Sequence, residues 1–97
     1  MDAMREDRNV ELFKKEVKQI VSRIAGIDQE ELQERVLIRD ELGIDSLRAM
    51  EIVGRCEKQL NLKIDEALLA DIRTFGDFLD LLIGLAKSRE KDDDGQH

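Results

Sequence analysis

Apolar side chains recur along this chain at the spacing of an α-helix, in three segments that polar and glycine-containing stretches separate. The segments cover residues 9–25, 46–60 and 75–87. None of them alternates apolar and polar residues with the period of two that marks a half-buried strand, and the sequence contains no proline. With 41% hydrophobic residues but only three aromatic ones, the core must be built from aliphatic side chains. A chain of 97 residues has room for one domain, and the pattern predicts that it is all-α.

The two ends of the chain lack this periodicity. Residues 1–8 are predicted to form a loose lead-in, with Asn9 as the N-cap of the first helix and Gly26 as the left-handed residue that ends it. Residues 88–97 are mostly charged and are predicted to form a disordered tail. The predicted domain therefore spans residues 9–87.

The stretches between the long segments carry shorter helical signals. Residues 28–31 have the form of a capping box that begins at Asp28, which predicts a brief helical turn over residues 29–34. Asp65 can cap a short third helix over residues 66–70, and Thr74, with Asp77 three residues later, can cap the last helix. We therefore expect a four-helix bundle with three longer helices, a short third helix and a long first loop. Apolar residues of that loop would pin it to the bundle: Val36, Leu37, Ile38 and Leu42.

The pair Asp45-Ser46 stands directly before the apolar set of the second helix, so one of the two residues is its expected N-cap. Gly43 permits a positive φ or a close backbone approach just before that helix. The Ser46 hydroxyl then lies beside the N–H groups at the positive end of the helix dipole, where an attached phosphate would be stabilised. Because an Asp-Ser pair before a helix is more often only a cap, the surrounding residues must decide its role.

The string Glu41-Leu42-Gly43-Ile44-Asp45-Ser46-Leu47 resembles the phosphopantetheine attachment site of acyl carrier proteins, whose signature is Asp-Leu-Gly-x-Asp-Ser-Leu. Glu41 stands in place of the first Asp. The resemblance extends without a gap from about Asn9 to about Leu85. Residues outside the string also sit where that family has matching ones: Ala25-Gly26-Ile27, Glu51, Lys63-Ile64 and Ile72-Arg73-Thr74-Phe75.

The resemblance implies a carrier of acyl groups and not an enzyme. A phosphopantetheinyl transferase, using coenzyme A and Mg²⁺, would attach 4′-phosphopantetheine to Ser46, with Asp45 and Leu47 as flanking parts of the site. The terminal thiol of that arm would carry acyl intermediates as thioesters between acyl-transferring or synthase enzymes of fatty-acid, polyketide or a related dedicated pathway. Because the sequence starts with Met and holds one domain, we expect a free-standing protein and a monomer, with excision from a larger synthase as the open alternative.

In that family the second helix recognises most partners, which implies a set of docking residues. Leu47 and Met50 are expected to be exposed apolar contacts, although periodicity alone would equally allow them in the core. Gly54 indicates either close packing or a passage left open for an acyl chain. The remaining docking candidates are charged: Arg48, Glu51, Arg55 and Glu57.

The charge of this helix departs from the family pattern, in which the second helix is strongly acidic. Residues 42–64 contain three acids and four bases, because Arg48, Arg55 and Lys58 join Lys63 there. The acidic residues lie mainly before and after the helix. We therefore expect a specialised carrier whose dedicated partners have mixed charge, and poor docking to the standard enzymes of fatty-acid synthesis.

Composition excludes several other functions. The net charge of −7 argues against binding to nucleic acid, and no apolar run is long enough for a membrane span. The charged N-terminus is unlike a secretory signal, and the single cysteine, Cys56, fits a reducing cytoplasm. With His97 as the only histidine, no catalytic Ser-His or Cys-His pair or zinc site is expected, and Asp92-Asp93-Asp94-Gly95 lacks the final Glu of a calcium loop.

Two alternatives stay open. The chain could keep the carrier fold as a helical interaction subunit that never receives phosphopantetheine. It could also be a peptidyl carrier, although such carriers usually have Gly-Gly before the attachment pair and Ile44 favours the acyl type.

Overall fold

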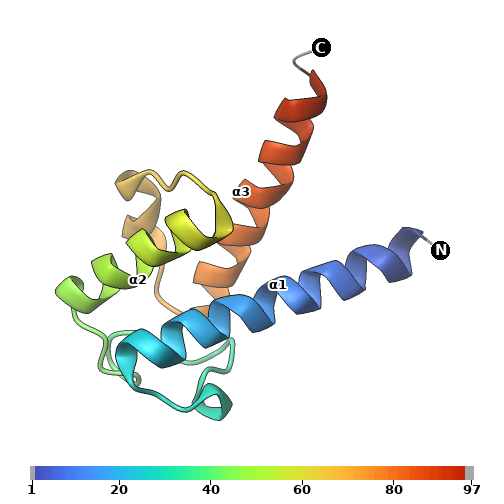
Figure 1. Cartoon of the computed structure of the whole chain (residues 1–97). Coiled ribbons are helices and arrows are strands. Elements are labelled where there is room, and N and C mark those ends of the chain that lie inside the picture. Colours follow the sequence, from blue (N-terminus) through green and yellow to red (C-terminus); the bar gives the residue numbers. More distant parts are fainter. Residues whose placement is uncertain (1, 96–97) are drawn as a thin grey trace.

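Three long α-helices and two short 3-10 helices make up the part of the chain that the computed structural model describes, which is the backbone of residues 2–95 and the side chains of residues 9–88 (Figure 1). In chain order the elements are α1 (Asp2–Ala25), η1 (Gln29–Glu31), α2 (Ser46–Leu60), η2 (Glu66–Asp71) and α3 (Phe75–Gly95). Within these residues the only β pairing is an isolated antiparallel bridge between Leu37 and Thr74. The predicted all-helical, carrier-like bundle is confirmed, with a 3-10 helix as its short third helix.

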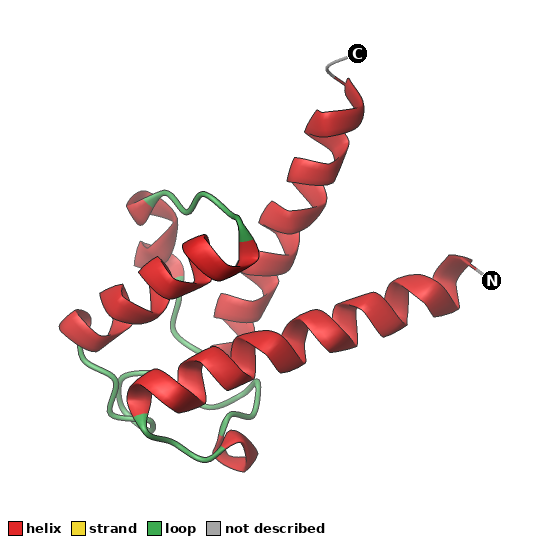
Figure 2. Ribbon diagram, in the orientation of Figure 1, coloured by secondary structure: helices red, strands yellow, loops and turns green. Residues whose placement is uncertain are grey.

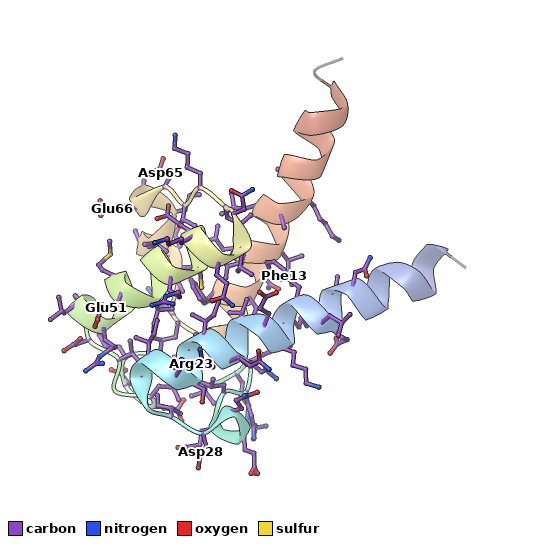
Figure 3. The ribbon with its side chains drawn as sticks, viewed as in Figure 1. Phe13, Arg23, Asp28, Glu51, Asp65 and Glu66 are labelled. Atoms are coloured by element: carbon purple, nitrogen blue, oxygen red, sulfur yellow. The ribbon has the colours of Figure 1, made fainter. Side chains whose placement is uncertain are left out.

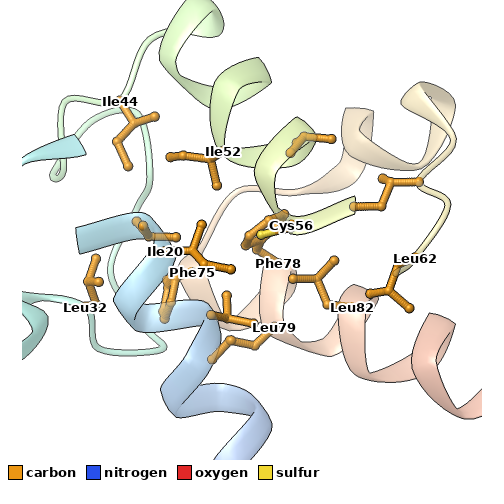
Figure 4. Packing of buried hydrophobic residues seen from close by; sticks show 14 residues of the cluster. Ile20, Leu32, Ile44, Ile52, Cys56, Leu62, Phe75, Phe78, Leu79 and Leu82 are labelled. Carbon is orange, nitrogen blue, oxygen red and sulfur yellow. The ribbon is translucent and has the colours of Figure 1, made fainter. Parts of the chain in front are cut away.

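One apolar core joins the three long helices. Helix α1 packs against both α2 and α3, and the loops on either side of α2 add side chains to the same cluster (Figures 1 and 4). Each long helix turns the apolar stripe predicted from its sequence toward this core. Within the described residues, no polar or charged side chain is buried. The buried residues are Val17, Ile20, Val21, Leu32, Ile44, Ile52, Val53, Cys56, Leu62, Ile64, Phe75, Phe78, Leu79 and Leu82.

Helices α1 and α3 are longer than the sequence pattern predicts. Helix α1 begins at Asp2, so the prediction of a loose lead-in with Asn9 as the N-cap is wrong over residues 2–9. Helix α3 continues to Gly95, where we expected a disordered tail from residue 88; residues 1, 96 and 97 lie outside the described chain. A missing apolar stripe indicates that a segment is not buried, but it does not exclude a helix. Residues 3–8 are mostly good helix formers (Ala, Met, Arg and Glu), and Arg89, Glu90 and Lys91 continue α3 beyond its apolar face. Both of these helix ends project away from the body of the molecule (Figure 1).

The long first loop is fixed to the start of α3 (Figure 2). The N–H of Ile38 donates to the carbonyl of Arg73 at 2.9 Å, and the N–H groups of Phe75 and Gly76 donate to the carbonyls of Val36 and Glu34 at 2.9 and 2.7 Å. The first N–H groups of a helix have no partner within the helix, so these loop carbonyls satisfy donors that α3 cannot satisfy itself. The loop and α3 therefore stabilise each other.

The remaining capping predictions differ in outcome. Thr74 and Asp77 form the predicted box, because the N–H of Asp77 donates to Thr74 Oγ1 at 3.0 Å and the N–H of Thr74 donates to Asp77 Oδ2 at 3.1 Å. Hydrogen bonds from the N–H groups of Thr74 and Arg73 hold the pKa of Asp77 below its ordinary value. The box predicted at Asp28 is wrong: Asp28 makes no side-chain cap bond, and η1 is a single 3-10 turn without a full first helical turn to cap.

Candidate functional site

Ser46 is the first residue of α2, and its side chain is exposed. Asp45 is the N-cap, since its Oδ1 accepts a hydrogen bond from the N–H of Arg48 at 2.8 Å. The open choice between Asp45 and Ser46 as the cap is thereby decided, and the Ser46 hydroxyl is not consumed by capping. Among the described residues, no hydrogen bond uses the N–H groups of Ser46 and Leu47, which leaves two donors at the positive end of the helix.

The loop before Ser46 is closed by its own backbone. Gly43 has φ +67°, a left-handed conformation that glycine adopts without strain, and the next residue, Ile44, enters the core with 5% of its surface exposed. The N–H of Ile44 donates to the carbonyl of Ile38 at 3.1 Å, and the N–H of Leu37 donates to Glu41 Oε1 at 2.9 Å. This turn presents Asp45 and Ser46 at the surface on a fixed support.

The same turn brings Arg39 back to Ser46. Arg39 Nη2 donates a hydrogen bond to Ser46 Oγ at 2.9 Å, although the two residues are seven apart in the chain. No helical spacing or motif in the sequence connects Arg39 with Ser46. Only the closure of the loop between Ile38 and Ile44 shows that the two side chains meet.

A cavity of about 740 Å³ opens beside Ser46, between α2, the first loop, η2 and the start of α3. Its exposed rim carries polar groups, among them Arg39, Asp40, Ser46 and Arg73. Its inner wall is made of core residues: Val21, Ile44, Ile52, Val53, Phe75 and Phe78. A cavity of this size with an apolar wall and a few polar groups at its opening is typical of a small-molecule site.

The apolar docking candidates on α2 face solvent. Leu47 exposes 76% of its surface and Met50 44%, so neither belongs to the core. Leu68 on η2 is also exposed, at 42%. These values remove the alternative that periodicity left open and place two large apolar side chains on the surface within one turn of Ser46.

Three of the charged candidates on α2 already have contacts within the chain. Arg48 donates from Nη1 to the carbonyl of Ile24 at 2.9 Å, at the C-terminal end of α1, and its Nε lies 3.7 Å from Glu51 Oε1. Glu57 Oε2 accepts the N–H of Ile64 at 2.8 Å, which fixes the loop after α2. Arg48 and Glu57 thus connect elements of the fold.

The remaining charged side chains near α2 are exposed and are spread over the surface. Arg55 is exposed and borders a shallow hollow between α1 and α2 that Arg23 also lines. Asp65 and Glu66 lie together at the start of η2, and Glu51 lies in the second turn of α2, all on the outside of the molecule (Figure 3). The surface around Ser46 is therefore of mixed charge.

Gly54 has neither of the two roles considered for it. It is exposed, an added Cβ would meet no atom within 4 Å, and it does not line the cavity beside Ser46. Both the close packing and the passage for an acyl chain are therefore wrong. A surface position on a helix simply tolerates the glycine.

Cys56 is fully buried on the core face of α2. Burial, with a smaller effect of the nearby Glu16 carboxylate, raises the pKa of the Cys56 thiol to about 12. The thiol is therefore protonated at neutral pH and is a poor nucleophile.

No group of three or more His, Cys, Asp or Glu side chains in the described part of the chain is arranged to hold a metal ion. Within the same residues, no helix is both long enough and apolar enough to cross a membrane.

Comparison with known proteins identifies the family. Residues 15–82 match the family model described as phosphopantetheine attachment site. The chain is 38% identical over 69 residues to an acyl carrier protein of Thermotoga maritima, covering 71% of this chain and 84% of that protein. It is 29% identical over 75 residues to an acyl carrier protein of Saccharopolyspora erythraea, covering 77% and 78% of the two chains. It is also 40% identical over 57 residues to polyketide-8 synthase acyl carrier protein 1 of Streptomyces avermitilis, covering 59% and 68%.

These matches account for the geometry around α2. A phosphopantetheine prosthetic group, partners among transferase and synthase enzymes, and a carrier role follow from the family. The chain belongs to the acyl carrier protein family and is a pantetheine-bearing acyl carrier.

Proposed function

We propose that Ser46 is the residue that receives phosphopantetheine. The observation that carries this proposal is the position of its hydroxyl, which is exposed at the first residue of α2, free of the capping bond that Asp45 makes, and at the rim of an apolar cavity. Asp45 acts by fixing the helix start, and Leu47 flanks the oxygen as an exposed apolar contact for the incoming enzyme. A phosphopantetheinyl transferase would use coenzyme A and Mg²⁺ for the attachment.

The residues around Ser46 fit such a group. The N–H groups of Ser46 and Leu47 and the guanidinium of Arg39 are donors that can face a phosphate. When bound, the arm supplies a thiol that holds acyl groups as thioesters activated for transfer. The protein supplies the anchor, the electrostatic surroundings of that anchor and an apolar wall.

The cavity supports a further part of the proposal, which is temporary shelter for the acyl cargo. Ile52, Phe75 and Phe78 offer an aliphatic or acyl chain a surface from which water is excluded, within reach of an arm rooted at Ser46. The length and the chemical type of the cargo, and hence the choice between fatty-acid, polyketide and related pathways, follow from which partners load it.

Partner choice is proposed to depend on Leu47 and Met50 as apolar contacts and on the mixed charges of α2. Arg48, Glu51, Arg55 and Glu57 remain the charged docking candidates, although the contacts of Arg48 and Glu57 within the fold leave Glu51 and Arg55 as the better ones. We further propose a monomer with residues 9–87 as the carrier domain, no catalytic turnover of its own, and a location in the cytoplasm.

The test of the attachment site is the intact mass after incubation with coenzyme A, Mg²⁺ and a promiscuous transferase. The wild type should gain one phosphopantetheine, and Ser46→Ala should gain none. Ser88→Ala is the matched control, because Ser88 is an exposed serine on α3 away from the cavity, and it should be loaded like the wild type. A wild type that stays unmodified while correctly folded would instead support the interaction-subunit alternative.

Charge reversal tests the proposed partner choice. Because Arg48 binds the carbonyl of Ile24, its reversal would disturb the contact between α1 and α2 as well as docking. Arg55→Glu combined with Lys58→Glu changes two exposed charges of α2 instead, and we expect faster acylation by a general fatty-acid synthase. Equal and high rates for this variant and the wild type would rule out a dedicated set of partners.

A further inference from the structure

Among the described residues, Arg39 is the one side chain with a hydrogen bond to the oxygen proposed for attachment, and no local pattern in the sequence assigns it a role. Its Nη2 donates to Ser46 Oγ at 2.9 Å. A guanidinium carries five N–H donors in a planar fork, so this contact leaves other donors of Arg39 beside the oxygen. The fork matches phosphate oxygens better than any other side chain does.

We propose that Arg39 binds the phosphodiester of the attached arm and directs the root of the arm over the cavity. This inference rests on the proposed attachment at Ser46. Once Ser46 Oγ becomes an ester oxygen it is a weak acceptor, whereas the free oxygens of the phosphodiester carry a negative charge. The guanidinium that contacts Oγ in the unmodified protein is therefore already placed to turn to those oxygens.

The charges at the rim of the cavity support the proposal. Two carboxylates, Asp40 and Asp45, line this rim together with two guanidinium groups, Arg39 and Arg73. The phosphodiester adds a further negative charge beside Asp45, whose carboxylate is only partly offset by the N–H of Arg48. Among these groups Arg39 is the cation in contact with Ser46, so it is the one that can offset the added charge directly.

The backbone prepares Arg39 for this role. Its neighbour Ile38 is bonded on both sides, through its N–H to the carbonyl of Arg73 at 2.9 Å and through its carbonyl to the N–H of Ile44 at 3.1 Å. A side chain that starts from a fixed backbone loses less conformational freedom when it binds than one on a free loop. Arg39 also lines the cavity, so a phosphate held by it roots the arm on the cavity side of α2.

Phosphorus NMR of the loaded protein tests the proposal, because the protein contains one phosphorus atom. The difference in phosphorus chemical shift between the folded and the urea-unfolded protein reports the fraction of molecules in which the protein holds the phosphate. In Arg39→Gln we expect the shift to move toward the unfolded value, with the odds of the held state falling roughly two- to fivefold, as for an exposed ion pair. The phosphorus shift of Arg39→Lys should lie between those of the wild type and Arg39→Gln, because lysine keeps the positive charge but lacks the planar set of guanidinium donors.

The matched control is Arg35→Gln, which removes an equal charge from an exposed position of the same loop that does not line the cavity. Its shift should equal that of the wild type. In about 1 M salt, where screening acts within roughly 3 Å, the wild-type shift should approach that of Arg39→Gln. Far-UV circular dichroism checks that each variant keeps its helices, as expected for an exposed side chain.

Two outcomes would overturn the role of Arg39. One is an identical phosphorus shift at low salt in the wild type, Arg39→Gln and Arg35→Gln. The other is that the transferase loads Arg35→Gln but not Arg39→Gln, which would assign Arg39 to transferase docking. Both differ from failure of the proposed function, in which the wild type itself receives no phosphopantetheine.

Discussion

At Cys56, burial governs the chemistry of the only thiol that the polypeptide itself carries. A rise of its pKa from 9.0 to about 12 lowers the thiolate fraction at neutral pH about a thousandfold. This matters for a carrier, because a reactive thiol in the chain would compete with the thiol of the arm for acyl groups. The fold thus reserves thioester chemistry for the arm.

Alkylation with iodoacetamide at pH 8 measures this protection. In the native protein without the arm we expect almost no modification of Cys56, and in urea we expect rapid modification. The loaded Cys56→Ala protein is the control, because its arm thiol should react at the same rate in the presence and absence of urea. Equal rates for native and unfolded Cys56 would contradict the burial argument.

At the scale of the element, two glycines of α3 allow the effect of packing and the effect of helix propensity to be measured separately. A Cβ at Gly76 would lie 2.8 Å from the carbonyl oxygen of Glu34, whereas a Cβ at Gly84 would meet nothing within 4 Å. Alanine is favoured over glycine by about 1 kcal/mol within a helix. The two positions should therefore respond to the same substitution with opposite signs.

We expect Gly76→Ala to destabilise the protein by about 1–3 kcal/mol, since the contact that must shift is with backbone and also carries a hydrogen bond. Gly84→Ala should stabilise it by about 0.5–1 kcal/mol. Urea unfolding followed by circular dichroism gives both values. A stabilising Gly76→Ala would mean that the loop is not fixed to the start of α3.

The capping box of α3 predicts a dependence of stability on pH. Because hydrogen bonds lower the pKa of Asp77 in the folded state, the unfolded state binds more protons at acidic pH. The stabilisation by Asp77 is thus fully present above its unfolded pKa, near 3.9, and is lost as the pH falls through the lower folded value.

Urea midpoints of the wild type and Asp77→Asn between pH 7 and pH 3 test this sign. The wild type should be more stable than Asp77→Asn at pH 7, and this difference in stability should become smaller below about pH 4. Thr74→Ala is the comparison, because it removes a neutral group of the same box and its cost of about 1 kcal/mol should change little with pH. A difference in stability between the wild type and Asp77→Asn that grows toward acidic pH would show that folding does not lower the pKa of Asp77.

For the whole molecule, loop side chains complete a core that is formed mainly by the helices. Leu32 lies between η1 and the bridge at Leu37, in a segment without periodicity, yet its side chain is fully buried against the cluster (Figure 4). Lys14 on α1 and Glu34 in the same loop form an ion pair at 2.9 Å, which raises the pKa of Lys14. The loop that carries the attachment turn is thus anchored to α1 as well as to α3.

We expect Leu32→Ala to cost about 2–5 kcal/mol, which is the range for a fully buried leucine. Leu12→Ala is the matched control, since Leu12 on α1 exposes 58% of its surface and should change stability by no more than about 0.5 kcal/mol. Chemical unfolding measures both. Similar costs for the two variants would show that the loop does not belong to the core.

The sequence by itself determined the helical fold, the extent of α2 from Ser46 to Leu60, the cap at Thr74 and the family resemblance, and it narrowed the cap of α2 to Asp45 or Ser46. These depend on short-range patterns, in which spacing, capping groups and glycine positions lie within a few residues of one another. The prediction was wrong at the outer ends of α1 and α3. Apolar periodicity indicates which helices are buried, and a helix in solvent does not need an apolar face.

Only the tertiary structure decided the surroundings of Ser46. The contact with Arg39, the burial of Leu32 and Ile44, the engagement of Arg48 and Glu57 within the fold, and the cavity all join residues that no local pattern connects. They depend on how the loops close and on how the helices pack against one another. The physical reason is that closure of a loop brings distant side chains together in space while leaving no periodic signal in the sequence.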